Sequence, residues 1–120
     1  MEAINLKGKF SLIQDYWRPR VIAELNGQQV KVAKFQGPFV WHHHEDADEM
    51  FLVIKGEFRL EFRDRVVPVR EGECIVVPRG VEHRPVAENE VHVILFEPCG
   101  VRNTGNVEDN DFTANEQPHI

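Results

Sequence analysis

Residues 37–56 read GPFVWHHHEDADEMFLVIKG. This stretch contains a His-x-His pair, His42 and His44, and a carboxylate five residues further on, Glu49. Because side chains on a strand repeat every second residue, His42 and His44 point to the same face of an extended segment. The histidine between them, His43, points to the opposite face, so we do not count it as a ligand. Two imidazoles and a nearby carboxylate indicate a metal site.

A second stretch, residues 72–83, reads GECIVVPRGVEH and ends in another histidine. Its Pro-Arg-Gly triplet is typical of a tight turn, which would deliver His83 from a separate strand pair. Three imidazoles and one carboxylate suit zinc, iron, manganese, nickel or copper, with room for water or substrate on a five- or six-coordinate ion. We therefore predict a site for one divalent transition metal, of unassigned identity, with the ligands His42, His44, Glu49 and His83.

The body of the chain reads as short strands separated by turns. The segments 21–25 and 29–35 meet across Asn26-Gly27, a strong hairpin signal because both residues tolerate positive φ. Many short strands with no long helix between them indicate an all-β sandwich or barrel. Further strands are expected at 39–44, 50–54, 58–63, 66–69, 74–77 and 91–97.

Two of these strands carry specific expectations about burial. Residues 58–63 alternate strictly, so Phe58, Leu60 and Phe62 are expected to line the core while charged residues face out. Residues 74–77 are expected to form a buried strand, with Cys74 as a core residue. The two cysteines have no close partner in the sequence, so we expect both thiols to be reduced.

The two ends of the chain differ from the body. We divide the chain into an N-terminal segment (residues 1–19), a barrel (20–98) and an irregular polar tail (99–120). The N-terminal segment is expected to hold a short helix starting at Asn5, and to bury Phe10, Tyr16 and Trp17 in a homodimer contact. The tail cannot build a core alone. It is either loose in solution or pinned, through Phe112, across the barrel or a partner subunit.

Composition excludes several classes of partner. A formal net charge of −6, with arginines interleaved among acids, argues against a nucleic-acid partner, because phosphate binding needs a basic surface. The longest apolar run, residues 50–54, has only five residues, so no membrane partner is expected. The start of the chain lacks the basic and then apolar pattern of a signal peptide, which favours a cytoplasmic location. A length of 120 residues suits a single domain.

The two glycine-framed motifs together resemble those of the cupin superfamily, the small double-stranded β-helix (jelly-roll) barrels. The second motif matches position by position, and fifteen residues separate Gly56 from Gly72, as in single-domain members. There are two departures: Gly37 lies one residue closer to His42 than usual, and Ala87 stands where the family usually has an asparagine. The matching positions are Gly37, His42, His44, Glu49, Gly56, Gly72, Pro78, Gly80 and His83.

The resemblance implies chemistry at the ion. With iron or manganese, such a site is similar to those of dioxygenases and oxalate-degrading enzymes; with zinc or nickel, to those of isomerases, lyases and epimerases. We therefore expect a metalloenzyme acting on a small oxygenated or carboxylate-bearing molecule. The alternatives are a non-catalytic small-molecule-binding cupin and a purely structural barrel. No catalytic residue is assigned, because the sequence shows no obvious second carboxylate in the pocket.

Charged residues near the motifs leave two interpretations open. Arg79 and Arg84 either hold an anionic substrate or sit at the rim, paired with Glu82 or Glu88. The acidic residues at 45, 46 and 48 are read as a solvated loop, although Asp48 is close enough in sequence to tune Glu49.

Overall fold

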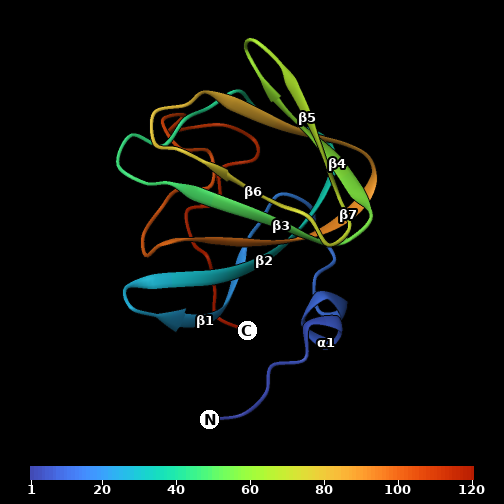
Figure 1. Cartoon of the computed structure of the whole chain (residues 1–120). Helices are drawn as coiled ribbons and strands as arrows, with labels where there is room; N and C mark the ends of the chain where they lie inside the picture. Colours follow the sequence, from blue (N-terminus) through green and yellow to red (C-terminus); the bar gives the residue numbers. More distant parts are fainter.

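The computed structural model describes all 120 residues and contains one short helix and seven strands (Figure 1). The elements are α1 (Leu6–Ser11), β1 (Arg20–Leu25), β2 (Gln28–Pro38), β3 (Glu49–Lys55), β4 (Glu57–Phe62), β5 (Val66–Arg70), β6 (Cys74–Val77) and β7 (His83–Pro98). Every pairing is antiparallel, and the strands follow the order β1-β2-β7-β3-β6, with β4 joining β7 to β5. The prediction of an all-β barrel is confirmed.

The long strand β7 organises the barrel because it pairs with three other strands. Its second half lies between β2 and β3, while its first residues pair with β4 and with the end of β2. Side chains from all of these strands meet in one core of fifteen buried apolar residues. Phe58, Leu60 and Phe62 belong to this core, as the strict alternation of β4 predicted.

Two local signals in the sequence are confirmed, one at the turn of the first hairpin and one at the start of the helix. Asn26 and Gly27 join β1 to β2 with φ values of 51° and 77°, the left-handed conformation that a tight two-residue hairpin turn needs. Helix α1 begins after Asn5, whose side-chain oxygen accepts a hydrogen bond of 2.7 Å from the backbone N–H of Gly8.

Three expectations about strands are wrong. Residues 39–44 do not form a strand, because Gly37 (φ 80°) shifts the register of β2 against β7 and the strand ends at Pro38. Strand β6 is only half buried, with Val77 in the core but Cys74 and Val76 exposed, because β6 pairs only with β3 and lies at the sheet edge. Strand β7 begins at His83, eight residues earlier than expected, where it takes β4 as its partner.

The N-terminal segment packs on its own chain. Phe10 and Trp17 are buried within one chain, so these two rings are not available for the dimer contact that the sequence suggested; Tyr16 alone is exposed. A homodimer therefore stays a prediction without these contacts. The only helix, α1, has six residues, so no helix of the structure is suited to crossing a membrane.

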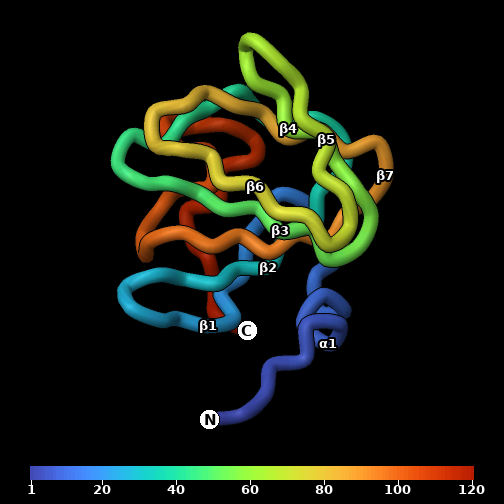
Figure 2. Tube along the Cα trace, in the orientation of Figure 1, coloured from blue at the N-terminus to red at the C-terminus, as the bar shows by residue number.

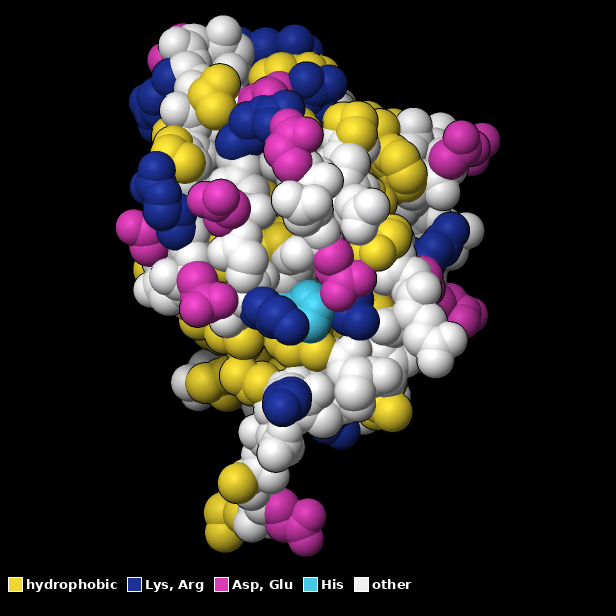
Figure 3. Space-filling model, turned by 90° about the vertical axis from the view of Figure 1, so that its right-hand side faces the viewer, with side chains coloured by type: hydrophobic (Ala, Val, Ile, Leu, Met, Phe, Trp, Pro, Cys, Tyr) yellow, Lys and Arg dark blue, Asp and Glu magenta, His cyan; other side chains and the backbone are white.

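The tail lies across the barrel. Figure 2 shows it running along one side of the barrel and ending beside β1. Phe112 stacks on Phe39 with ring centroids 5.5 Å apart, and the chain end is tied to β1 by hydrogen bonds of the backbone of Val21 with Pro118 and Ile120. The face in Figure 3 shows acidic and basic side chains interspersed, with no large patch of one sign.

Candidate metal centre

The ligand side chains come from two segments that the backbone holds together. His42 lies in the loop between β2 and β3, and its backbone exchanges two hydrogen bonds, of 3.0 and 2.9 Å, with that of His83. The carbonyl oxygen of His44 accepts a further hydrogen bond of 2.7 Å from the N–H of Gly80, within the tight turn before β7. Glu49 is the first residue of β3. Main-chain pairing therefore brings the two motifs to one place.

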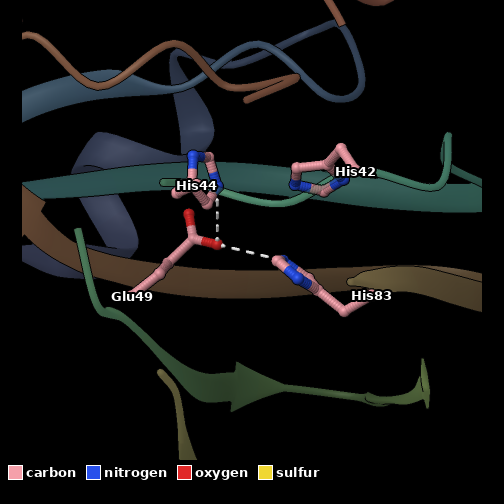
Figure 4. A group of neighbouring side chains, drawn as sticks. All are labelled: His42, His44, Glu49 and His83. Carbon is pink, nitrogen blue, oxygen red and sulfur yellow. Dashed lines mark ion pairs between the residues drawn. The ribbon is translucent and has the colours of Figure 1, made fainter. Parts of the chain in front are cut away.

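The structure brings all four predicted ligands together. The side chains of His42, His44, Glu49 and His83 are buried, and one nitrogen or oxygen atom from each lies within 4.8 Å of the others. Figure 4 shows the four side chains pointing toward a common centre. Glu49 Oε1 lies 3.3 Å from His44 Nε2 and 3.4 Å from His83 Nε2. This arrangement can hold a metal ion.

Hydrogen bonds of the imidazoles orient the free nitrogens. Nδ1 of His42 lies 3.0 Å from the carbonyl oxygen of Val40, and Nδ1 of His83 lies 2.9 Å from that of Val81. A carbonyl oxygen only accepts, so the neutral imidazoles donate from Nδ1 and keep the lone pair on Nε2. Such backbone contacts are the usual way in which ligand histidines are oriented.

Several buried atoms at the centre have no hydrogen-bond partner. They are Nε2 of His44, Nε2 of His83 and Oε1 of Glu49. Leaving buried polar atoms unpaired costs about 1–3 kcal/mol for each group. One divalent cation at the centre would satisfy all three at once, and imidazole and carboxylate are ordinary ligands of transition metals. The residues present therefore fit a metal ion.

The electrostatics keep the ligands in the states that bind cations. Burial lowers the pKa of His42 to about 3, and the neighbouring His83 adds to this effect, so His42 is neutral at physiological pH. Burial raises the pKa of Glu49, but the imidazoles of His44 and His83 outweigh it and hold the pKa well below its ordinary value. A neutral imidazole and an ionised carboxylate are the ligand forms that metals require.

The metal-free protein is expected to lose stability as the pH falls from about 6.5 toward about 3. The folded pKa of His42, about 3, lies below its ordinary value of 6.5, so the unfolded chain binds this proton first. The resulting slope is at most about 1.4 kcal/mol per pH unit. Urea unfolding of chelator-treated protein at about pH 7 and about pH 4.5 measures it. A His42→Asn variant should lose less stability on acidification; an equal loss would contradict the assignment.

Charged residues flanking the ligands are engaged elsewhere. His43 lies outside the centre, with its Nε2 3.5 Å from Glu45. Asp48 accepts a hydrogen bond from the backbone of Arg79, so it does not contact the centre through that oxygen. Arg79 and Arg84, whose roles the sequence left open, are both paired with carboxylates, although not with Glu82 or Glu88. Arg79 lies 3.4 Å from Asp48, Arg84 lies 2.6 Å from Glu61, Arg63 contacts Glu82, and Arg59 contacts Glu88.

An apolar wall closes the barrel beside the ligands. A cavity of about 20 Å³ lies next to His42 and Glu49, room for about one water molecule. Trp17 stacks between Phe35 and Phe39 at this end, with centroid distances of 4.4 and 4.7 Å. Asn103 of the tail donates a 3.0 Å hydrogen bond to the carbonyl oxygen of Trp17. Trp17 and the tail therefore cover the mouth of the barrel.

Sequence reasoning missed three residues near the centre: Trp17, Asn103 and Glu97. Glu97 had a readable signal, because it continues the every-second-residue row of Val91, Val93 and Leu95, all of which face the core. Its side chain is almost fully buried. Burial raises the pKa of Glu97 well above its ordinary value, and the Glu49 carboxylate adds to this, against the opposing effect of Lys31. Glu97 is thus a second buried carboxyl group of the barrel, although it does not line the cavity beside the ligands.

Gly105 holds the tail against the loop that carries the ligands. A Cβ atom there would lie 2.2 Å from the carbonyl oxygen of His43, a backbone atom between two ligands. Gly105→Ala is therefore expected to lower the free energy of unfolding by about 1–3 kcal/mol, as measured by urea unfolding. Gly100→Ala is the matched control, because Gly100 also has positive φ but has open space around it. An equal loss in both variants would show that backbone conformation, and not the clash, matters.

Comparison with known proteins identifies the family. The chain belongs to the cupin family, whose cupin domain model matches residues 25–99. It is similar to a cupin-2 domain containing protein from Shewanella frigidimarina NCIMB 400, with 47% identity, a TM-score of 0.79, and coverage of 80% of this chain and 94% of the other. It is also similar to protein NMB1881 from Neisseria meningitidis, with 37% identity, a TM-score of 0.75, and coverage of 81% and 99%.

Two further similarities are more limited. The uncharacterized protein YdbB of Bacillus subtilis (strain 168) is 39% identical over 64 residues, which are 52% of this chain and 57% of YdbB. The chain thus covers little more than half the length of that relative. Hydroquinone 1,2-dioxygenase PnpCD shares the fold with a TM-score of 0.65 at 16% identity, covering 80% of this chain and 72% of the other. At that identity the likeness concerns the fold alone.

Proposed function

We propose that this protein is a metal-dependent cupin enzyme that acts on a small oxygenated or carboxylate-bearing molecule. The observation that carries the proposal is the convergence of four buried ligand atoms, three of them without a hydrogen-bond partner. Iron or manganese would supply redox chemistry with dioxygen, and zinc or nickel would supply a Lewis acid. The ligands would be His42, His44, Glu49 and His83.

The chain's own residues would contribute orientation and exclusion of water. Backbone contacts hold the His42 and His83 rings in one tautomer, which presents Nε2 to the centre. The aromatic wall of Trp17, Phe35 and Phe39 keeps bulk water away from the ligands. A dry, preorganised site strengthens electrostatic contacts with a charged or polarised substrate group.

A non-catalytic small-molecule-binding cupin is the second candidate. It is favoured by the lining of the small cavity beside the ligands, in which His42 and Glu49 are the only titratable residues and no free general acid or base is present. The arginines at the rim are paired with carboxylates, so neither is free to bind an anion without breaking a pair. Binding alone needs neither a general base nor a free cation.

Metal content and turnover, measured on one preparation, separate the two candidates. Protein purified without chelator or affinity-tag metal is analysed for metals, loaded with the ion found, and screened for oxygen uptake and substrate conversion with small diketones and hydroxyacids. Turnover that is lost in His83→Ala and kept in His119→Ala supports the enzyme. Saturable binding with no conversion supports the binding protein. A wild-type protein that takes up no metal, even on reconstitution, overturns the proposal.

A further inference from the structure

A buried pair of charged residues lies directly behind the candidate metal centre. Lys31 of β2 and Glu97 of β7 are 0% and 1% exposed in their side chains, and Lys31 Nζ donates a 2.8 Å hydrogen bond to Glu97 Oε1. Burying such a pair contributes little to stability, and apolar residues of similar size often serve as well or better. Neither residue was assigned a role by the ligand motifs. The position of this pair therefore calls for a function.

Strand register places Glu97 beside the ligand Glu49. In the β3–β7 pairing, Phe51 lies opposite Leu95 and Met50 opposite Phe96, so the next position sets Glu49 opposite Glu97. Both side chains are buried, in the rows that face the barrel interior. Directly opposed side chains on one face of a sheet are neighbours.

The second carboxyl oxygen of Glu97 has no hydrogen-bond partner. Oε1 of Glu97 accepts from Lys31, whereas Oε2 is buried and without a hydrogen-bond partner. On the other carboxyl group, Glu49 Oε1 faces His44 and His83. The remaining oxygen of Glu49 is therefore the one available to Glu97, and a hydrogen bond donated by the Oε2–H of a neutral Glu97 carboxyl would satisfy both atoms.

We propose that Glu97 is a positioning residue, which bridges Lys31 and Glu49 and so holds Glu49 with a single oxygen directed at the metal ion. The chain of contacts runs from Lys31 through Glu97 to Glu49. Glu97 fixes the carboxylate plane of Glu49 from behind, which prevents it from turning to bind through both oxygens. When an ion is bound, this restraint on Glu49 would leave one coordination position for water or substrate. This inference rests on the metal binding of the proposed function.

The test measures metal binding rather than activity. Two quantities are compared between variants. The first is the Zn²⁺ affinity, measured by competition with a chromophoric chelator, and the second is the visible absorption of the Co²⁺-loaded protein. Glu97→Gln retains an acceptor for Lys31 and a donor toward Glu49, so its affinity is expected within about threefold of wild type, with an unchanged Co²⁺ spectrum. Glu97→Leu keeps the bulk and loses both contacts. It is expected to bind Zn²⁺ about 10–100-fold more weakly and to show altered Co²⁺ bands.

A double variant distinguishes loss of the contact with Glu49 from loss of folding. Glu97→Leu alone leaves the Lys31 charge buried without its partner, whereas Lys31→Met combined with Glu97→Leu replaces the whole pair by apolar residues. The double variant is expected to fold and to bind Zn²⁺ as weakly as Glu97→Leu. Asp15→Asn, which weakens the partly buried Asp15–Arg20 pair away from the centre, is the control and should leave both readouts unchanged.

The possible outcomes distinguish failure of this inference from failure of the proposed function. Wild-type affinity and spectrum in the double variant would overturn the positioning role while leaving the metal site intact. A Glu97→Gln protein as weak as Glu97→Leu would also overturn it, because the charge of Glu97 and not its bridging geometry would then matter. A wild-type protein that binds neither Zn²⁺ nor Co²⁺ would overturn the proposed function itself.

Discussion

Replacing His83 with alanine is expected to abolish tight metal binding. His83 is fully buried, and its Nε2 is one of the unpartnered atoms at the centre. Loss of residues that merely orient a ligand typically weakens metal binding about 10–100-fold, so loss of a ligand should cost more than about 100-fold. Titration of Zn²⁺ measures the affinity directly. The rise in melting temperature on adding the ion should disappear as well, because a ligand stabilises only the state that it binds.

A matched control distinguishes this effect from the loss of any histidine. His119 is exposed and contacts Glu24 at the chain end, so His119→Ala should bind the ion as the wild type does. The melting temperature of metal-free His83→Ala shows whether the variant is folded. An unaltered Zn²⁺ affinity in a folded His83→Ala protein would remove His83 from the ligand set.

Replacing Trp17 with alanine is expected to have the largest effect on stability. Trp17 is buried between Phe35 and Phe39, and its Nε1–H donates a 3.0 Å hydrogen bond to the carbonyl oxygen of Gln36. Truncation of a buried tryptophan to alanine costs about 3–5 kcal/mol, which urea unfolding measures. Because Trp17 covers the mouth of the barrel, chelators should also extract a bound ion faster from the variant.

The other tryptophan supplies the control. Trp41 is only partly buried, and its ring lies against the guanidinium of Arg63 at 3.8 Å. Trp41→Ala should therefore cost only about 1 kcal/mol, the size of an exposed cation–π contact, and should leave the extraction rate unchanged. Equal costs in both variants, or equal extraction rates, would show that Trp17 does not close the mouth.

The conformation of Trp17 illustrates what the sequence alone could not reveal. Its φ of 67° is unusual for a bulky residue, and such a conformation persists only where surrounding contacts impose it. The contacts come from far along the chain. The backbone N–H of Trp17 donates to the carbonyl oxygen of Lys34, and the carbonyl oxygen of Trp17 accepts from the side-chain amide of Asn103. Reading the segment locally placed Trp17 in a homodimer contact, whereas the structure buries it within one chain.

The sequence by itself determined the barrel class and the grouping of the candidate ligands. The barrel class follows from local rules: the two-residue period of strands such as β4 and the left-handed turn at Asn26-Gly27. These signals lie within a few residues of one another, so no knowledge of distant contacts is needed. The grouping of His83 with the other three ligands came instead from the resemblance to the two cupin motifs.

The tertiary structure alone decided how the site is closed and supported. The docking of the tail through Asn103, the burial of Trp17 and the Lys31–Glu97 pair behind Glu49 join residues 66 to 86 positions apart. The loss of the expected strand at 39–44 has the same origin, because a register shift at Gly37 depends on pairing with β7. Such features depend on which distant strands become neighbours, and a local pattern contains no information about that choice.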